Sequence, residues 1–173
     1  MRPTAGKCAL IIFGSMLGFL FLQSTVLNGL TFWGVRPDLV LILVGSVALA
    51  RGWGEGLLWG MVGGLLEDVF SGGLFGSRAL AKSVTGFALG LAEGQVFKEN
   101  PFLPAVAVLL GTLLEEVLFF LVAGAFGQVR WTFLNALRQA VIPTAFINTL
   151  IAPVIYWYVV RLGDKRALGQ RER

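Results

Sequence analysis

The chain has 173 residues, of which 56% are hydrophobic and only 14% are charged, and its formal net charge is +4. Because a soluble domain carries about a quarter charged residues, this composition predicts an integral membrane protein, and no nucleic-acid partner is expected. A single cysteine, Cys8, excludes an internal disulfide, and the absence of histidine excludes imidazole metal sites and histidine-assisted nucleophiles. We therefore expect no catalytic residues, no metal ligands and no cofactor.

Two predicted spans precede the glycine-rich part of the chain. Residues 8–27 form an apolar stretch that we interpret as a retained helix, because no convincing cleavage site ends it and more spans follow. The second span covers about residues 37–53, and its apolar run is short for a bilayer. Pro37 suits the first turn of this helix, where its missing N–H costs little, and Asp38 suits its positive end.

The third and fourth spans, about residues 56–70 and 78–97, carry glycines every four residues. These ladders consist of Gly52, Gly56, Gly60 and Gly64, then Gly86, Gly90 and Gly94. Glycines four apart lie on one face of a helix and let a second helix approach closely in lipid. We therefore predict a hairpin built as a packing surface, although glycine is also simply common in membrane helices. Whether the surface is used inside the fold or against another protein stays open.

A polar turn joins the two spans of this hairpin. Its candidate partner-binding residues are Asp68, Ser71, Gly72, Gly76, Arg78 and Lys82. The glycines permit positive φ and a tight return of the chain.

The fifth and sixth spans cover about residues 102–126 and 134–160, and residues 161–173 form a basic tail. Six spans place both termini on one side of the membrane. That side carries more basic residues, namely Arg2, Lys7, Arg51, Lys98, Arg161, Lys165, Arg166, Arg171 and Arg173. The other side carries fewer, namely Arg36, Arg78, Lys82, Arg130 and Arg138. The excess predicts cytoplasmic termini, so we expect a single all-α transmembrane domain with about six helices and an outward-facing polar turn.

Ionisable residues inside spans are costly and are functional candidates by default. We predict an internal network among Asp68, Arg78, Lys82, Glu115, Glu116 and Arg138. In it, Asp68 pairs with Arg78 or Lys82, and one of the two glutamates pairs with Lys82 or Arg138. The network fits a structural role, and a proton or ion pathway and recognition of a partner helix or small ligand are the alternatives.

Three segments resemble the MreD family of bacterial rod-shape proteins: RPDL at 36–39, GLLEDVFSG at 64–72 and LFGSRAL at 74–80. The resemblance covers about residues 36–90. Its matching positions are Pro37, Asp38, Asp68, Ser71, Gly72 and Gly76. The family usually has a proline shortly before the loop glycine, where this chain has Leu74, so the turn could differ in shape.

This resemblance implies a non-enzymatic scaffold of the cell-elongation machinery in the bacterial cytoplasmic membrane. The implied partners are a bitopic MreC-like protein, RodA with its penicillin-binding transpeptidase and, indirectly, the MreB filament. The implied fold is similar to that of the S components of energy-coupling-factor transporters. One alternative is therefore a true S component that binds a vitamin at an outer pocket, and another is a proton-coupled transporter. Formation of a homodimer is left open.

Overall fold

The computed structural model describes residues 5–25, 37–72, 74–93, 102–127 and 141–167. Within these ranges the chain forms helices and no strand, so the predicted all-α architecture is confirmed. The helices are α1 (Ala5–Thr25), α2 (Leu39–Arg51), α3 (Trp53–Ser71), α4 (Ser77–Gly90), α5 (Phe102–Ala125) and α7 (Ile142–Ala167).

Three of the helices contain stretches long and apolar enough to cross a membrane. These stretches are Gly6–Thr25 in α1, Phe102–Ala125 in α5 and Ile142–Leu162 in α7. Helix α2 is also apolar but has only 13 residues, or about 20 Å of helix. The membrane class predicted from composition therefore agrees with the lengths of the helices.

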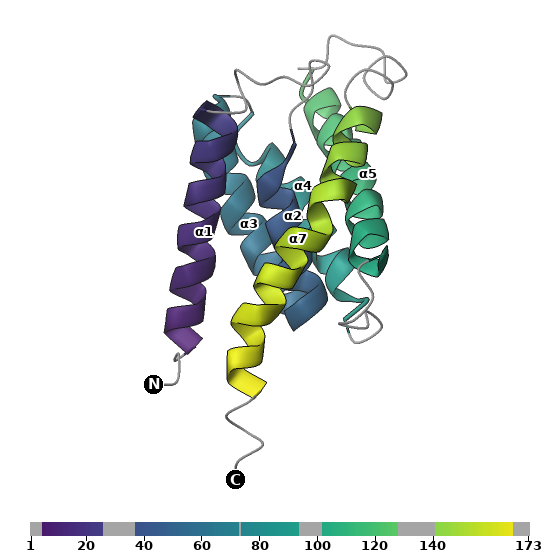
Figure 1. The fold of residues 1–173 in the computed structure, drawn as a ribbon. Helices are drawn as coiled ribbons and strands as arrows, with labels where there is room; N and C mark the ends of the chain where they lie inside the picture. Colours follow the sequence, from purple (N-terminus) through teal and green to yellow (C-terminus); the bar gives the residue numbers. More distant parts are fainter. Residues whose placement is uncertain (1–4, 26–36, 73, 94–101, 128–140, 168–173) are drawn as a thin grey trace.

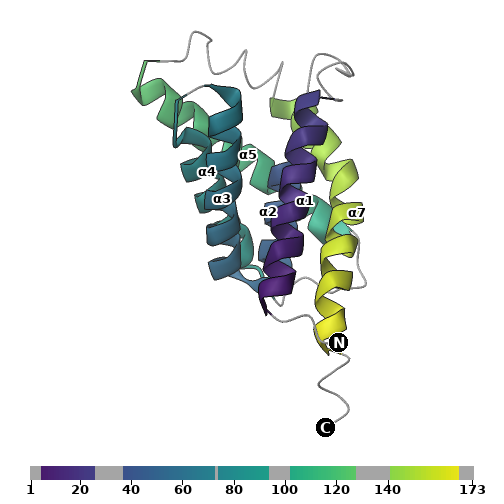
Figure 2. The same cartoon turned by 90° about the vertical axis from the view of Figure 1, so that its left-hand side faces the viewer.

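Helix α2 forms the centre of the bundle, and every residue from Leu39 to Leu49 is buried. A helix that is hydrophobic all round is expected in such a position. Figure 2 shows α1 passing in front of α2, with α3 and α4 on one side and α7 on the other. The core around α2 includes Ile12, Met16, Val40, Leu43, Val44, Val47, Trp59, Val108 and Val159.

Helices α3 and α4 pack backbone against backbone through the predicted glycine ladders. A Cβ added at Gly56 would collide with the carbonyl oxygen of Gly86, and one added at Gly60 would collide with that of Lys82. A Cβ at Gly64 would collide with the backbone of Ala79. The close approach predicted from the ladders is thus present inside the fold.

Of the two uses left open from the sequence, this packing is the one inside the fold. The grooves of Gly56, Gly60 and Gly64 are filled by α4, and those of Gly86 and Gly90 are filled by α3. Gly94 lies outside the described residues.

Helix α4 is shorter than its predicted span. Helix α4 ends at Gly90 instead of continuing to residue 97, because the following N–H groups switch to bonds three residues back, from Ala92 to Leu89 and from Glu93 to Gly90. The predicted start of the last span at 134 lies outside the described residues. In Figure 1, the N-terminal end of α1 and the C-terminal end of α7 lie at the same end of the bundle.

Candidate functional site

Lys82 of α4 is completely buried and lies among three carboxylates from three other parts of the chain. Its Nζ atom lies 2.6 Å from Glu115 Oε1 and 3.0 Å from Glu67 Oε2, and it also pairs with Asp38 Oδ2. We call this cluster the lysine cage. Charge-assisted contacts of this kind offset part of the cost of placing an ammonium group inside a membrane protein. One of the two glutamates was predicted to pair with Lys82 or Arg138, and the structure shows Glu115 paired with Lys82.

Asp38 is held in the lysine cage by the start of α2. One carboxylate oxygen accepts a hydrogen bond from the Leu41 N–H at 2.8 Å, as expected for an N-cap, and the other faces Lys82. The backbone N–H of Asp38 donates to Asn148 Oδ1 at 2.9 Å, and Asn148 Nδ2 contacts Thr112 Oγ1 at 3.2 Å. These bonds connect the cage to α5 and α7.

Glu67 connects the cage to α1 and to Arg78. The Gln23 side chain donates from Nε2 to Glu67 Oε1 at 2.7 Å and accepts from the Leu39 N–H at 3.2 Å. Arg78 lies 3.7 Å from Glu67 Oε2, and its guanidinium carbon lies 4.7 Å from the centre of the Phe119 ring. A cation over an aromatic face is a favourable contact.

Asp68 does not join the ion pairs, which differs from the prediction that it pairs with Arg78 or Lys82. Its carboxylate instead accepts from the backbone N–H groups of Gly76 at 2.9 Å and of Arg78 and Ala79 at 3.2 Å each. These are the unpaired donors at the positive end of α4. The neighbouring carboxylate, that of Glu67, forms the ion pairs with Arg78 and Lys82 instead.

The turn before α4 uses the glycines predicted for it. Gly72 has φ +64° and Gly76 has φ +93°, values that side-chain-bearing residues rarely adopt. Ser71 Oγ donates to the carbonyl oxygen of Asp68 at 3.4 Å, and Ser77 Oγ donates to that of Leu74 at 2.7 Å. The tight return therefore sets the position of the first turn of α4.

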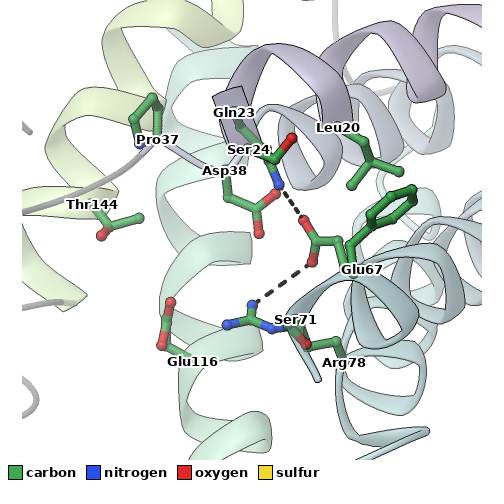
Figure 3. A pocket seen from close by; sticks show the side chains of 11 residues that line it. Leu20, Gln23, Ser24, Pro37, Asp38, Glu67, Ser71, Arg78, Glu116 and Thr144 are labelled. Atoms are coloured by element: carbon green, nitrogen blue, oxygen red, sulfur yellow. Dashed lines mark hydrogen bonds and ion pairs between the residues drawn. The ribbon is translucent and has the colours of Figure 1, made fainter. Parts of the chain in front are cut away.

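A pocket of about 410 Å³ lies beside the lysine cage, at the end of the bundle opposite the described ends of the chain. Its lining residues are Leu20, Gln23, Ser24, Pro37, Asp38, Glu67, Phe70, Ser71, Arg78, Glu116 and Thr144. Figure 3 shows Glu116 entering from α5, opposite Glu67 and Arg78. Glu115 faces the cage and Glu116 the pocket, as expected from the ~100° between adjacent helical residues. Arg138 lies outside the described residues, so its predicted pairing is not described.

Oxygen atoms of Asp38, Glu67 and Glu115 lie within 4.8 Å of one another, a spacing at which three carboxylates can hold a metal ion. Lys82 Nζ lies among these atoms and pairs with each of the three residues. The positive charge in the cage is therefore supplied by the chain itself.

Gln23, Thr112 and Asn148 belong to the polar network but were missed in the sequence. The available signal was a polar side chain inside an apolar span. An uncharged polar side chain inside a span is a weaker signal of a site than a charged one, because it costs less to bury.

The comparisons with known proteins give one finding. The sequence model of a protein family described as rod shape-determining protein MreD matches residues 5–166. No curated protein and no solved structure matches the chain. The similarity of fold to S components therefore stays a prediction.

Proposed function

The chain belongs to the MreD family of rod shape-determining proteins, and we propose from this membership that it is a non-enzymatic scaffold of the bacterial cell-elongation machinery. In this role it resides in the cytoplasmic membrane as a multi-pass protein and binds a bitopic MreC-like protein. Through that partner it acts with RodA, with the penicillin-binding transpeptidase and, indirectly, with the MreB filament. The observation that carries the proposal is the family match over residues 5–166.

The lysine cage supports a scaffold role over a catalytic one. Lys82 is 0% exposed and Glu115 is 1% exposed, so neither group meets a substrate in this arrangement. Their contacts join α4 to α5, and those of Asp38 and Glu67 bring in the start of α2 and the end of α3. We infer that these ion pairs hold the helices in one arrangement, as a binding platform requires.

The test is depletion of the protein in its native rod-shaped bacterium, with cell shape as the readout. We expect rounded cells, because lateral wall synthesis loses its coordination with the cytoskeleton, and we expect a plasmid copy to restore rods. Cells that stay rod-shaped but require an added vitamin would contradict the scaffold and favour an S component.

A biochemical test complements depletion. The full chain, co-expressed with the MreC-like protein of the same bacterium, is expected to co-purify with it in mild detergent. The control is an unrelated bitopic membrane protein, co-expressed in the same way, which should not co-purify. Failure of the two proteins to co-purify would contradict a direct complex.

A further inference from the structure

A second pocket, of about 470 Å³, lies at the other end of the bundle, near the start of α1. It is lined by Ala9 of α1, by the end of α2 and the start of α3, and by Glu93, which follows α4. Its size is within the range of about 300–1,000 Å³ that is typical of binding pockets. The charged side chains in its lining are those of Arg51, Glu55 and Glu93. The pocket therefore presents groups of both signs to a ligand.

Arg51 has hydrogen-bonding capacity that the protein leaves unused. Its Nη1 atom lies 3.5 Å from Glu55 Oε2, which is longer than a normal hydrogen bond, and that oxygen accepts its hydrogen bond from Trp59 Nε1 at 3.1 Å. Arg51 Nη2 is buried and has no hydrogen-bond partner among the residues that the structure describes. A guanidinium group carries five N–H donors, and a buried donor without an acceptor is costly. Arg51 therefore favours an anionic group in the pocket.

Glu93 reaches the same pocket because Gly52 has no side chain. Gly52 joins α2 to α3 with φ +93°, and a Cβ added there would collide with the Glu93 carboxylate. Glu93 is exposed, and it forms no ion pair with any residue in the described part of the chain. The turn between α2 and α3 thus places a carboxylate without a cation beside a guanidinium with unused donors.

Trp53 and the exposed face of α3 give the pocket an apolar border. The Trp53 side chain is 55% exposed, and its ring packs edge-on against Phe87 with 5.8 Å between the ring centres. Leu57, Leu58 and Met61 continue the exposed apolar surface along α3. Tryptophan is typical of the membrane–water interface, where lipid headgroups meet the acyl chains. A phospholipid at this position places its headgroup in the pocket and its chains on α3.

We propose that this pocket binds the headgroup of a phospholipid that carries both a phosphate and a primary amine, as phosphatidylethanolamine does. The phosphate pairs with the Arg51 guanidinium, and the ammonium pairs with Glu93 next to the Trp53 ring. The acyl chains lie along Leu57 and Leu58. A lipid without the amine leaves Glu93 unpaired and adds a negative charge beside it, which repels the carboxylate. A free phosphate ion has the same disadvantage and makes no apolar contact.

Native mass spectrometry of the full chain, purified and delipidated in detergent, tests the choice of lipid. Phosphatidylethanolamine, phosphatidylglycerol and phosphatidylcholine with identical acyl chains are titrated separately. We expect one molecule of phosphatidylethanolamine to bind with a Kd at least about tenfold smaller than that of either other lipid. Equal affinities for the three lipids would overturn the proposal. Displacement of the bound lipid by inorganic phosphate would also overturn it, because the site would then be one for free anions.

Substitution of Arg51 tests the phosphate contact. Arg51→Gln should raise the Kd for phosphatidylethanolamine at least about tenfold, because the charge-assisted hydrogen bonds to the phosphate are lost. Arg161→Gln is the matched control, since the Arg161 guanidinium also lies beside a tryptophan, 3.5 Å from the centre of the Trp157 ring, but outside this pocket. It should bind the lipid like the wild type. Unchanged binding by Arg51→Gln would overturn the proposal.

Substitution of Glu93 tests the amine contact at an exposed position. Glu93→Gln should bind phosphatidylethanolamine and phosphatidylglycerol with similar affinity, because the carboxylate that distinguishes the two headgroups is gone. A Glu93→Gln protein that keeps the full preference for phosphatidylethanolamine would overturn the proposal. Melting temperatures equal to that of the wild type establish that each variant is folded, and if Arg51→Gln melts lower, the result for Glu93→Gln decides.

Discussion

At the scale of single residues, Lys82 is the shared cation of three carboxylates, those of Asp38, Glu67 and Glu115. We expect Lys82→Met to destabilise the folded protein by about 3–5 kcal/mol, because it leaves three carboxylates, two of them buried, without their shared cation. Thermal unfolding in detergent, followed by size-exclusion chromatography, measures the loss. Lys7→Met, at an exposed position of α1, is the matched control and should melt like the wild type.

Combining Lys82→Met with Glu115→Gln tests whether charge balance causes the loss. The double variant should be more stable than Lys82→Met alone, because it removes one of the unpaired charges. A double variant that is less stable than either single variant would show that packing, and not charge, dominates at this position.

Asp68 gives a second prediction at this scale. Asp68→Ala should cost about 1–2 kcal/mol, because three backbone N–H groups at the start of α4 lose their acceptor. Asp68→Asn should cost less, since one oxygen acceptor remains although the charge is lost. The melting temperature in detergent reports both values. Ser71→Ala removes only a 3.4 Å hydrogen bond and serves as the control; equal losses in Asp68→Ala and Ser71→Ala would contradict the capping role.

Single residues could be predicted from the sequence where charge and local structure agree. Asp38 was expected at a helix start and forms the N-cap there, but its contact with Lys82 crosses 44 residues of sequence. Asp68 was expected to pair with a cation because it is charged and near Arg78. Its true partners are backbone N–H groups, which the sequence does not distinguish from those of any other turn.

At the scale of helices, the α3–α4 hairpin shows what a repeat of small residues can and cannot predict. The four-residue spacing predicted close packing, and the packing is present between Gly56 and Gly86. The spacing could not predict which helix fills the groove, because a helix of the same chain and a helix of another protein offer similar backbones. Only the three-dimensional arrangement identifies α4.

The hairpin gives a prediction with a control on the same helix. Gly60→Ala should destabilise the protein by about 1–3 kcal/mol or more, because the added Cβ meets the backbone of Lys82 and Ser83. Gly54→Ala should be tolerated, because nothing lies within 4 Å of a Cβ there. Melting temperatures compare the two variants. A Gly60→Ala protein as stable as Gly54→Ala would show that the helices separate easily.

Helix α2 shows why the length of an apolar run does not by itself identify a membrane span. With 13 residues it is shorter than a usual span. Its neighbours are other helices on all sides, so its length is set by the bundle and not by the thickness of the lipid. From its length alone, it was uncertain whether this segment spans the membrane. Its continuous apolar sequence, however, agrees with the burial of α2.

At the scale of the whole molecule, the side of the membrane on which each end of α3 lies is still a prediction. The excess of lysine and arginine predicts that the termini are cytoplasmic and that the turn before α4 faces outward. In a Cys8→Ser background, a cysteine at Phe75, which is 68% exposed, should react with a membrane-impermeant reagent in intact cells. A cysteine at Trp53, which is 55% exposed at the other end of α3, should react only after permeabilisation. The reverse labelling pattern would show that the protein has the opposite orientation in the membrane.

The lysine cage also bears on whether the fold depends on metal ions in the medium. Three convergent carboxylates can hold a metal ion, and a fold that depends on such an ion loosens when the medium is depleted of it. Here the counter-ion is covalently tethered to α4 and cannot be diluted, exchanged or chelated. With a lysine as the resident cation, the contacts that join these helices do not depend on a bound metal ion.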